Sequence, residues 1–433
     1  MNIAQIHAFQ IFDSRGNPTV QADVVLQNGI RGRGLVPSGA STGAREALEL
    51  RDTDPGRFRG KSVTRAVQNV NGEIAKAICG MDCGDQVRID ETLIKLDGTP
   101  NKSRLGANAI LAVSMAVADA ARKVQGKLLY ECLAGGHGSL LPLPEIQIIG
   151  GGAHAERRMD VQDFLLIAAG AQTYLECLEM TFNVYHAAKD LLRKRGALFG
   201  ITDEGGFWPN FSSNEEVLNF MVEVIEAAGY KPGKDLAISL DIAASELFDE
   251  KNGRYRFASE KREFTSEQFV ALMAEWCGKY PIISLEDPVG ECDWEGWASI
   301  SAALGGKIQL VGDDLFCTNP LLIQRGIDAG VANAVLIKPN QIGTVTETVS
   351  AIRLTQTAGW LPIISARSGE TEDAFVSHLA VATDAGQLKV GAFSRSERMA
   401  KWNELIRIQN ALGERARFIG AHIFHRFQGT ATG

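Results

Sequence analysis

Charged side chains follow or interrupt six successive apolar runs of the chain. The first three runs end in carboxylates, and the next three carry cationic side chains. Carboxylates from neighbouring strand ends repel one another unless a cation lies between them, and their oxygens are ligands that Mg²⁺ prefers. The pattern predicts a magnesium site with basic residues beside it. In chain order these residues are Asp241, Glu286 with Asp287, Asp313 with Asp314, Lys338, Arg367 and Lys389.

Two lysines in this set, Lys338 and Lys389, are candidates for proton transfer. Nearby cations and burial both lower the pKa of a lysine, so we expect reduced pKa values here. One lysine would then act as a general base and the other as an electrostatic clamp. Removing a proton beside a carboxylate creates an enediolate, whose charge metal ions can stabilise. The alternative is that these residues are solvated loop ends, which explains a single position better than a whole series.

The apolar runs are the elements that must position these side chains. Short runs without alternation are typical of parallel strands that are covered on both faces. Helical patterns fill the intervals between them, which predicts an α/β fold with a (β/α)8-type barrel. Barrel strands end at one rim, where active sites form. A doubly wound sheet is the alternative. The runs lie at 236–240, 281–285, 308–311, 334–337, 361–365 and 387–392.

The first part of the chain has a different pattern. Residues 2–37 alternate as short strands do, and helical periodicity begins near residue 62. Strands followed by helices favour a small α+β domain. A Gly/Pro-rich passage at 133–144 is the candidate linker. We therefore expect an N-terminal α+β capping domain at 1–134, a catalytic barrel at 143–413 and a C-terminal tail at 414–433.

Composition excludes several classes of protein. The 433 residues are 45% hydrophobic and 22% charged, which is typical of globular chains. A net charge of −8 gives no electrostatic reason to bind nucleic acid. No apolar segment is long enough for a membrane span, and the start does not resemble a signal peptide. The seven cysteines are scattered, which predicts reduced thiols in the cytoplasm.

Nine stretches of the sequence closely resemble enolase, the 2-phosphoglycerate dehydratase of glycolysis. They extend over nearly the whole chain, to about residue 413. The resemblance implies a magnesium-dependent hydro-lyase, a small phosphorylated carboxylic acid as substrate, and a homodimer. The stretches are DSRGNPTV (13–20), VPSGASTGAREALELRD (36–52), DGTPNKSRLGANAIL (97–111), DEGGFWPN (203–210), SLEDPVGECDWEGW (284–297), VGDDLFCTNP (311–320), LIKPNQIGTVTET (336–348), RSGETEDAF (367–375) and RSERMAKWNEL (395–405).

The resemblance implies roles for the metal-binding residues and the base. The first Mg²⁺ would be held by Asp241, Glu286 and Asp313. Ser41, in the SGASTG loop, would help to hold a second Mg²⁺ that arrives with the substrate. Lys338 would remove the proton from C2 of the substrate.

The resemblance also implies roles for residues around the substrate. Glu204 would act as the acid that assists departure of the C3 hydroxide, and Lys389 would clamp the substrate carboxylate. Arg367 and Ser368 would bind the phosphate. Three more side chains fall on active-site positions of the family, and these are His154, Gln162 and Asp163.

The sequence departs from the family pattern around the acid. Ala366 replaces the histidine of SHRSGE, and Asp163 replaces the glutamate of QEF. HAERR (154–158) places Arg157 and Arg158 where the family has small or neutral residues. One interpretation is an enolase with an altered acid side. Another is a paralogue acting on a related phosphorylated or carboxylated acid, with the two arginines pairing with an extra anionic group. A non-catalytic scaffold is the third.

Overall fold

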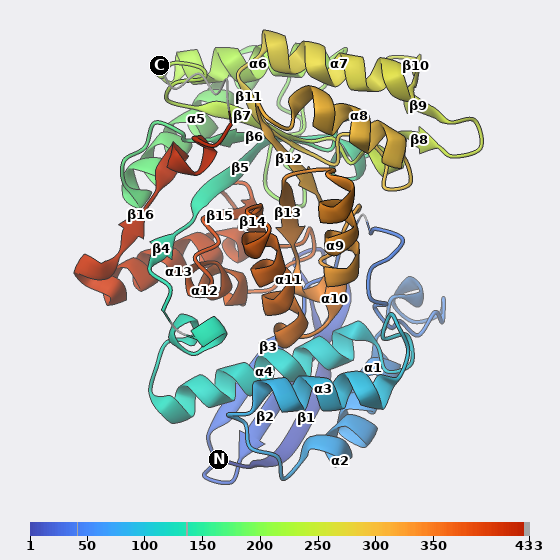
Figure 1. Cartoon of the computed structure of the whole chain (residues 1–433), viewed down its shortest axis with the longest axis vertical. Helices are drawn as coiled ribbons and strands as arrows, with labels where there is room; N and C mark the ends of the chain where they lie inside the picture. The colour runs from blue at the N-terminus through green and yellow to red at the C-terminus, as the bar shows by residue number, and fades with distance from the viewer. Residues whose placement is uncertain (41, 136, 428–433) are drawn as a thin grey trace.

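The computed structural model describes residues 1–40, 42–135 and 137–427. Within this part of the chain, a three-stranded sheet with its helices forms the N-terminal portion, and eight strands close into a barrel in the remainder. Figure 1 shows the blue N-terminal sheet and its helices at one end and the barrel at the other. The predicted fold class, an α+β portion followed by an α/β barrel, is confirmed.

The N-terminal sheet is antiparallel, in the order β1-β2-β3. Helix α4 packs on β2 and β3 and buries most of its length, which explains its long apolar sequence. Figure 1 shows α3 and α4 lying side by side beneath the barrel. The elements are β1 (Ile3–Phe12), β2 (Pro18–Leu26), β3 (Arg31–Leu35), α1 (Thr64–Asn69), α2 (Ala75–Ile78), α3 (Gln86–Asp97) and α4 (Ala107–Gln125).

The six apolar runs of the sequence form six of the barrel strands, β7 and β11 to β15. The barrel closes in the order β11-β12-β13-β14-β15-β5-β6-β7. Two strands, β5 and β6, were not among the predicted runs. The barrel strands are β5 (Leu143–Gly150), β6 (Asp163–Ile167), β7 (Ala237–Asp241), β11 (Ile282–Glu286), β12 (Gln309–Gly312), β13 (Ala334–Ile337), β14 (Leu361–Ser365) and β15 (Gln387–Gly391).

Strand β6 departs from the all-parallel arrangement, because it pairs antiparallel with both β5 and β7. The connection from β5 to β6 spans residues 151–162 and holds only a short 3-10 turn at Gly152–Ala155. A parallel return is usually made through an α-helix, and these residues form none, so the chain comes back antiparallel. The start of β6 therefore lies at the rim where the other strands end.

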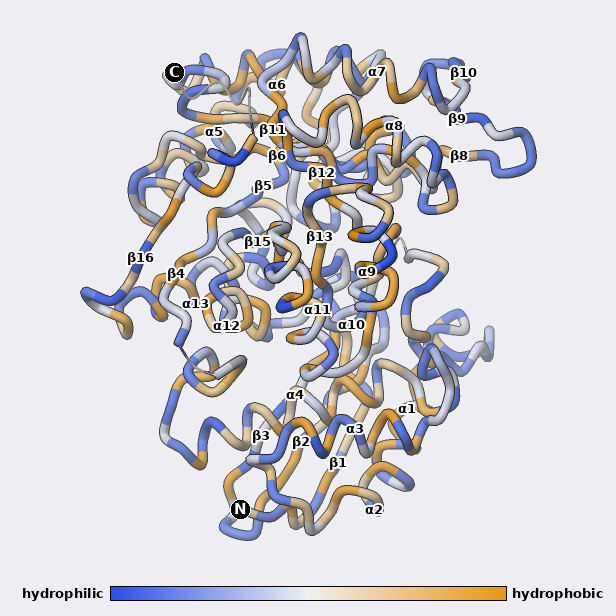
Figure 2. Tube along the Cα trace, viewed as in Figure 1, coloured by the Kyte–Doolittle hydropathy of each residue, from blue (hydrophilic) through white to orange (hydrophobic). Residues whose placement is uncertain are grey.

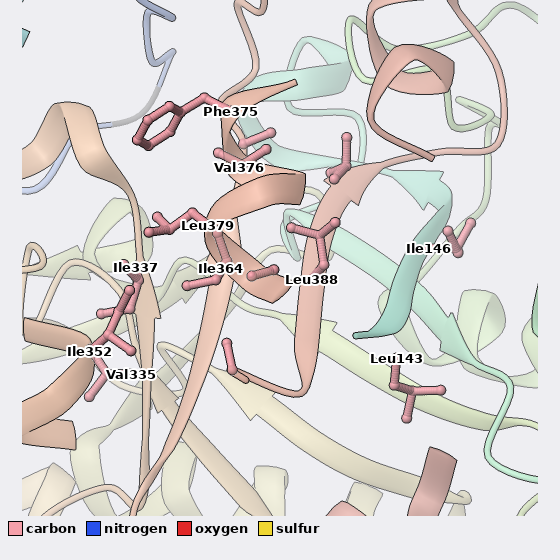
Figure 3. Close-up of a cluster of buried hydrophobic side chains, with 14 of the residues drawn as sticks. Leu143, Ile146, Val335, Ile337, Ile352, Ile364, Phe375, Val376, Leu379 and Leu388 are labelled. Atoms are coloured by element: carbon pink, nitrogen blue, oxygen red, sulfur yellow. The ribbon is translucent and has the colours of Figure 1, made fainter. Parts of the chain in front are cut away.

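The two faces of the barrel strands carry different apolar sets. Leu336 and Ile363 belong to a small cluster that is separate from the main core, whereas Val335 and Ile337 belong to the main core. Figure 3 shows the main-core side chains of β13 to β15 together with those of α11 and α12. The barrel helices are α5 (Tyr174–Lys194), α6 (Asn214–Ala227), α7 (Ser266–Lys279), α8 (Trp294–Leu304), α9 (Pro320–Ala329), α10 (Pro339–Ile342), α11 (Val345–Thr357), α12 (Phe375–Ala382) and α13 (Ser396–Leu412).

Five short strands lie outside the barrel and the N-terminal sheet. Figure 2 shows hydrophilic colour at the tip of the β8–β9 hairpin and hydrophobic colour along β13. In the tail, β16 pairs with β4. No helix in the described part of the chain is both long and apolar enough to cross a bilayer. These strands are β4 (Leu140–Leu141), β8 (Phe248–Asp249), β9 (Arg254–Phe257), β10 (Arg262–Thr265) and β16 (Arg417–Phe418).

Candidate active site

The three predicted ligands of the first metal lie at one rim of the barrel. Asp241 is the last residue of β7, and Glu286 is the last residue of β11 and lies opposite it in register. Asp313 comes directly after β12. All three side chains are buried. The barrel backbone therefore places Asp241 and Glu286 at the same level, and Asp313 two residues beyond the register partner of Glu286 on the next strand.

The two predicted lysines lie among these carboxylates. Lys389 Nζ is 2.8 Å from Asp241 Oδ2 and 2.8 Å from Glu286 Oε2. Lys338 Nζ is 2.5 Å from Asp313 Oδ2. Burial lowers the pKa of each lysine, but the carboxylates outweigh it, so the pKa of Lys338 is raised and that of Lys389 is well above its ordinary value. The predicted lowering concerns lysines beside bound metal ions and stays a prediction, because the pKa shifts here reflect the carboxylates without a metal.

The acidic side chains around this rim fit a hard cation. Burial, and then the Asp241 carboxylate, raise the pKa of Glu286 well above its ordinary range, so the carboxylates repel one another despite the lysines. Side-chain oxygens of Asp287, Asp313 and Asp314 also lie within 4.8 Å of one another. Oxygen donors with surplus negative charge are the set that Mg²⁺ takes. Ser41, the predicted ligand of a second ion, lies outside the described residues.

A second group of predicted residues forms across the pocket, where β5 and β6 meet. Asp163 is the first residue of β6 and pairs in register with Asp241 of β7. His154, on the turn after β5, lies between two carboxylates: its Nδ1 is 3.1 Å from Asp163 Oδ1, and its Nε2 is 4.0 Å from Glu204 Oε1. All of these side chains are buried. The antiparallel return of β6 brings Asp163 into the site.

The charges of this second group are set by His154. Burial lowers the pKa of its imidazole, but the carboxylates of Asp163 and Glu204 outweigh burial and raise the pKa to about 10. Burial raises the pKa of Glu204, yet the charges of His154, Arg398, Lys389 and Lys338 together outweigh it, so this pKa is lowered overall. The pKa of Asp163 is raised, mainly by burial. The group thus stores a proton on His154 beside the Glu204 carboxylate.

The predicted substrate-binding residues line the same pocket as these two groups. Gln162 Nε2 donates to Asp241 Oδ2 over 3.1 Å, which links the pocket wall to the first carboxylate. Arg367 Nη1 donates to Glu46 Oε2 over 3.0 Å, so the predicted phosphate binder forms an ion pair with the N-terminal portion. Ser368 Oγ accepts from Arg15 Nη1 over 3.3 Å. Two N-terminal side chains therefore contact the lining residues at this end of the pocket.

The two arginines of HAERR do not line the pocket. Arg157 Nη2 pairs with Glu246 Oε2 over 2.6 Å, and about two thirds of its side chain is exposed. The guanidinium of Arg158 lies over Trp208, 5.1 Å from the ring centroid. The structure thus gives no support to the suggestion that this pair binds an extra anionic group of a substrate. Ala366, in contrast, does line the pocket.

Sequence reasoning missed several residues that contact the site. Gln147 and Glu145 lie on β5 and are buried, and Glu46 and Arg15 come from the N-terminal portion. A signal for the first pair was present, since two polar residues at i and i+2 interrupt the apolar run LPEIQIIG and so share one face of the strand. No signal marks Glu46 or Arg15 beyond their place in the family-like stretches.

Comparisons with known proteins agree with this geometry. Residues 3–133 match the family model "Enolase, N-terminal domain", and residues 138–427 match "Enolase, C-terminal TIM barrel domain". The chain is also 53% identical to Enolase 1 of Desulfitobacterium hafniense (strain Y51) over 423 residues, which covers 98% of this chain and 97% of the relative.

Proposed function

The chain belongs to the enolase family, and from this premise we propose that it dehydrates 2-phosphoglycerate to phosphoenolpyruvate. As a family member it is an enolase-like carbon–oxygen lyase. The observation that carries the proposal is the placement of Lys338 and Lys389 against three buried carboxylates on adjacent strand ends.

The base half of the reaction belongs to Lys338. Asp313 raises the pKa of Lys338, and a Mg²⁺ bound to Asp313 would offset that effect, so Lys338 would take the C2 proton of the substrate as a neutral amine. The electron pair left behind would delocalise into the substrate carboxylate. Lys389 lies beside this carboxylate position, where its charge would hold the ligand in place. Two Mg²⁺ ions, bound by Asp241, Glu286 and Asp313 and on the Ser41 side, would supply positive charge to the developing dianion.

The acid half belongs to Glu204 together with His154. The C3 oxygen leaves as water and needs a proton, and the electron pair of the C2 carbanion forms the new double bond. Glu204 would receive the proton held on His154 Nε2, 4.0 Å away, and pass it on to this oxygen. Asp163 holds the imidazole from the other nitrogen. Arg367 and Ser368 bind the phosphate. The guanidinium of Arg367, which pairs with Glu46, would then also pair with the phosphate.

Formation of phosphoenolpyruvate, followed by ultraviolet absorbance with and without Mg²⁺, tests the proposal. We expect absorbance to rise only with Mg²⁺ and to stop after chelation. Exchange of the C2 hydrogen with solvent deuterium is measured in parallel. If the C2 hydrogen exchanges but no phosphoenolpyruvate forms, the assignment of the base stands and dehydration of this substrate is contradicted. If neither exchange nor product is detected, the result favours a non-catalytic scaffold.

Two residues favour one alternative, a related phosphorylated or carboxylated acid as substrate. Ala366 lines the pocket and Asp163 carries a shorter side chain than the glutamate of the family motif. A different substituent at C3 of the substrate would contact Ala366 and Asp163 before other residues. We further propose a cytoplasmic homodimer. All seven cysteines are free thiols, as a reducing compartment requires.

A further inference from the structure

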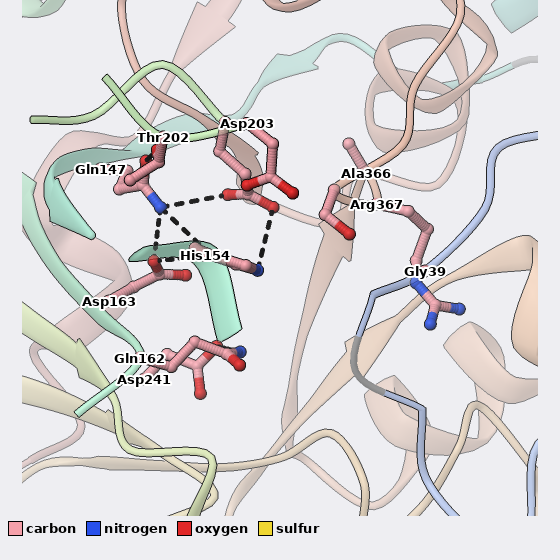
Figure 4. Close-up of polar contacts among 12 residues, drawn as sticks. Gly39, Gln147, His154, Gln162, Asp163, Thr202, Asp203, Asp241, Ala366 and Arg367 are labelled. Atoms are coloured by element: carbon pink, nitrogen blue, oxygen red, sulfur yellow. Dashed lines mark hydrogen bonds and ion pairs between the residues drawn. The ribbon is translucent and has the colours of Figure 1, made fainter. Parts of the chain in front are cut away.

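We propose that Gln147 is a positioning residue that ties Asp163 to Glu204 and thereby sets the acid half of the reaction. The inference rests on the proposed function, because it concerns how that reaction loses its C3 oxygen. Figure 4 shows Gln147 on β5 with dashed lines running from its amide nitrogen to Asp163, to His154 and to the neighbouring carboxylate. Its side chain is fully buried.

The amide of Gln147 contacts every member of this group. Nε2 donates to Asp163 Oδ1 and lies 3.5 Å from Glu204 Oε2, at the long limit of a hydrogen bond. The same nitrogen is 3.5 Å from His154 Nδ1. One N–H therefore points to each carboxylate, on either side of the imidazole.

The orientation of this amide is determined by its other contacts. Oε1 accepts from the backbone N–H of Gly206 over 2.9 Å and from Thr202 Oγ1 over 2.8 Å. A backbone N–H can only donate and a carboxylate can only accept, so the oxygen must face Gly206 and the nitrogen must face Asp163. Gly206 lies two residues after Glu204, so the amide also fixes the turn that carries the acid.

Two glycines make the room that the amide occupies. A Cβ at Gly206 would lie 2.4 Å from Gln147 Oε1, and one at Gly150 would lie 2.4 Å from Thr202 Cγ2 and 3.4 Å from Gln147 Nε2. Contacts near 2.4 Å force atoms to move, so neither position accepts a larger residue without displacing the amide or its threonine. The slot for Gln147 is thus built from both strand β5 and the Glu204 turn.

Gln147 and Asp163 have complementary lengths. Asp163 is one methylene shorter than the glutamate of the family motif, and the long side chain of Gln147 reaches it directly. Lengthening Asp163 alone would push a carboxylate into the amide. Shortening Gln147 alone would leave Asp163 Oδ1 and Gly206 N–H without this partner. Both changes together would restore the span between the two strands.

The experiment compares four variants with the wild type: Gln147→Leu, Gln147→Asn, Asp163→Glu, and Gln147→Asn with Asp163→Glu. Two rates are measured with 2-phosphoglycerate, phosphoenolpyruvate formation and C2 hydrogen exchange. We expect Gln147→Leu to lower kcat for product about 10- to 100-fold while exchange stays within about threefold of wild type. KM should change little. The double variant should recover most of the activity that each single variant loses.

A matched control is Gln309→Leu, which also removes a buried barrel glutamine but one that bonds to Ser284 and Gln387. It should change exchange and product formation in the same proportion. Equal loss of both rates in Gln147→Leu, or simple additivity in the double variant, would overturn the proposal, because either result describes a purely structural side chain.

A spectroscopic readout makes the test independent of the substrate. The imidazole ¹⁵N resonances of His154 in the substrate-free protein should shift in Gln147→Leu, whereas those of His378, on α12, should not. A wild type that forms no phosphoenolpyruvate would overturn the proposed function alone. Unmoved His154 resonances in folded Gln147→Leu would overturn the role of Gln147 whatever the substrate is.

Discussion

The base half and the acid half of the pocket are built in different ways. In the base half, Asp241, Glu286, Asp313 and Lys338 come at the ends of four successive parallel strands, so the barrel backbone sets their spacing. In the acid half, Asp163 begins an antiparallel strand, and Glu204 and His154 lie on turns. Side-chain lengths, rather than strand register, determine how the acid groups meet. Departures from the family pattern accumulate in this second half.

This difference teaches where such a site can change. To move a carboxylate at a strand end, the barrel backbone would have to move. In the acid half, a side chain that is shorter by one methylene can be compensated by a longer neighbour, as Gln147 reaches Asp163. The base half therefore keeps its residues, and the acid half is the place where rate or substrate is adjusted.

The largest effect is expected from the base half. Glu286→Gln removes one of the buried carboxylates that Lys389 contacts, and with it several kcal/mol of charge stabilisation, so activity should fall by on the order of 10³-fold. Steady-state rates and Mg²⁺ titration by calorimetry measure the loss. Glu295→Gln, an exposed position on α8, is the control. Wild-type rates in Glu286→Gln would contradict a metal site at this rim.

A pH-dependent effect on the free energy of unfolding is expected from Glu145 on β5. Burial raises the pKa of Glu145 from 4.5 to about 7, although Lys389 and a hydrogen bond from Ser239 oppose it. The unfolded chain then releases its proton first, so stability is lost as pH rises from 4.5 to 7. Glu145→Gln has no carboxyl group to titrate here and should not lose this stability. Between pH 4.5 and 8, its free energy of unfolding should therefore rise by about 3 kcal/mol relative to that of the wild type. Urea melts at both pH values measure it, and parallel pH curves would contradict it.

A smaller gain is expected from the acid half. Ala366→His adds a donor to the pocket wall, and one hydrogen bond to a charged group should raise kcat/KM for 2-phosphoglycerate by about tenfold. Ala366→Leu, which adds volume without a donor, is the matched control. A loss with histidine would favour a different acid as the substrate, because the pocket would then be shaped for another C3 group.

The smallest effect should come from outside the pocket. Arg157→Ala breaks an exposed ion pair with Glu246, and such pairs contribute less than about 1 kcal/mol. Activity should change by less than about threefold, and the difference should vanish at high salt. A loss of activity above tenfold that persists at high salt would indicate that Arg157 takes part in catalysis or substrate binding. The acid half of the site would then extend to the protein surface.

Much of the fold and of the base half could be predicted from the sequence. Each of the six apolar runs is a strand, and the residue after each run is fixed in space by the barrel. Strand β6 contains the short apolar run FLLI (164–167), which was not singled out as a strand. Its antiparallel direction depends on the connection from β5, which the pattern of the strand itself does not reveal. Gln147 was not assigned, because a polar residue inside a strand gains its role only from the turn that folds against it.

The exchange of the C2 hydrogen of 2-phosphoglycerate for deuterium, followed by NMR, tests the central claim most directly. Wild type should exchange this hydrogen in the presence of Mg²⁺, and Lys338→Ala should lose exchange while retaining Mg²⁺ binding. Exchange at the wild-type rate in a folded Lys338→Ala variant would contradict the account, because the proton would then leave by another group.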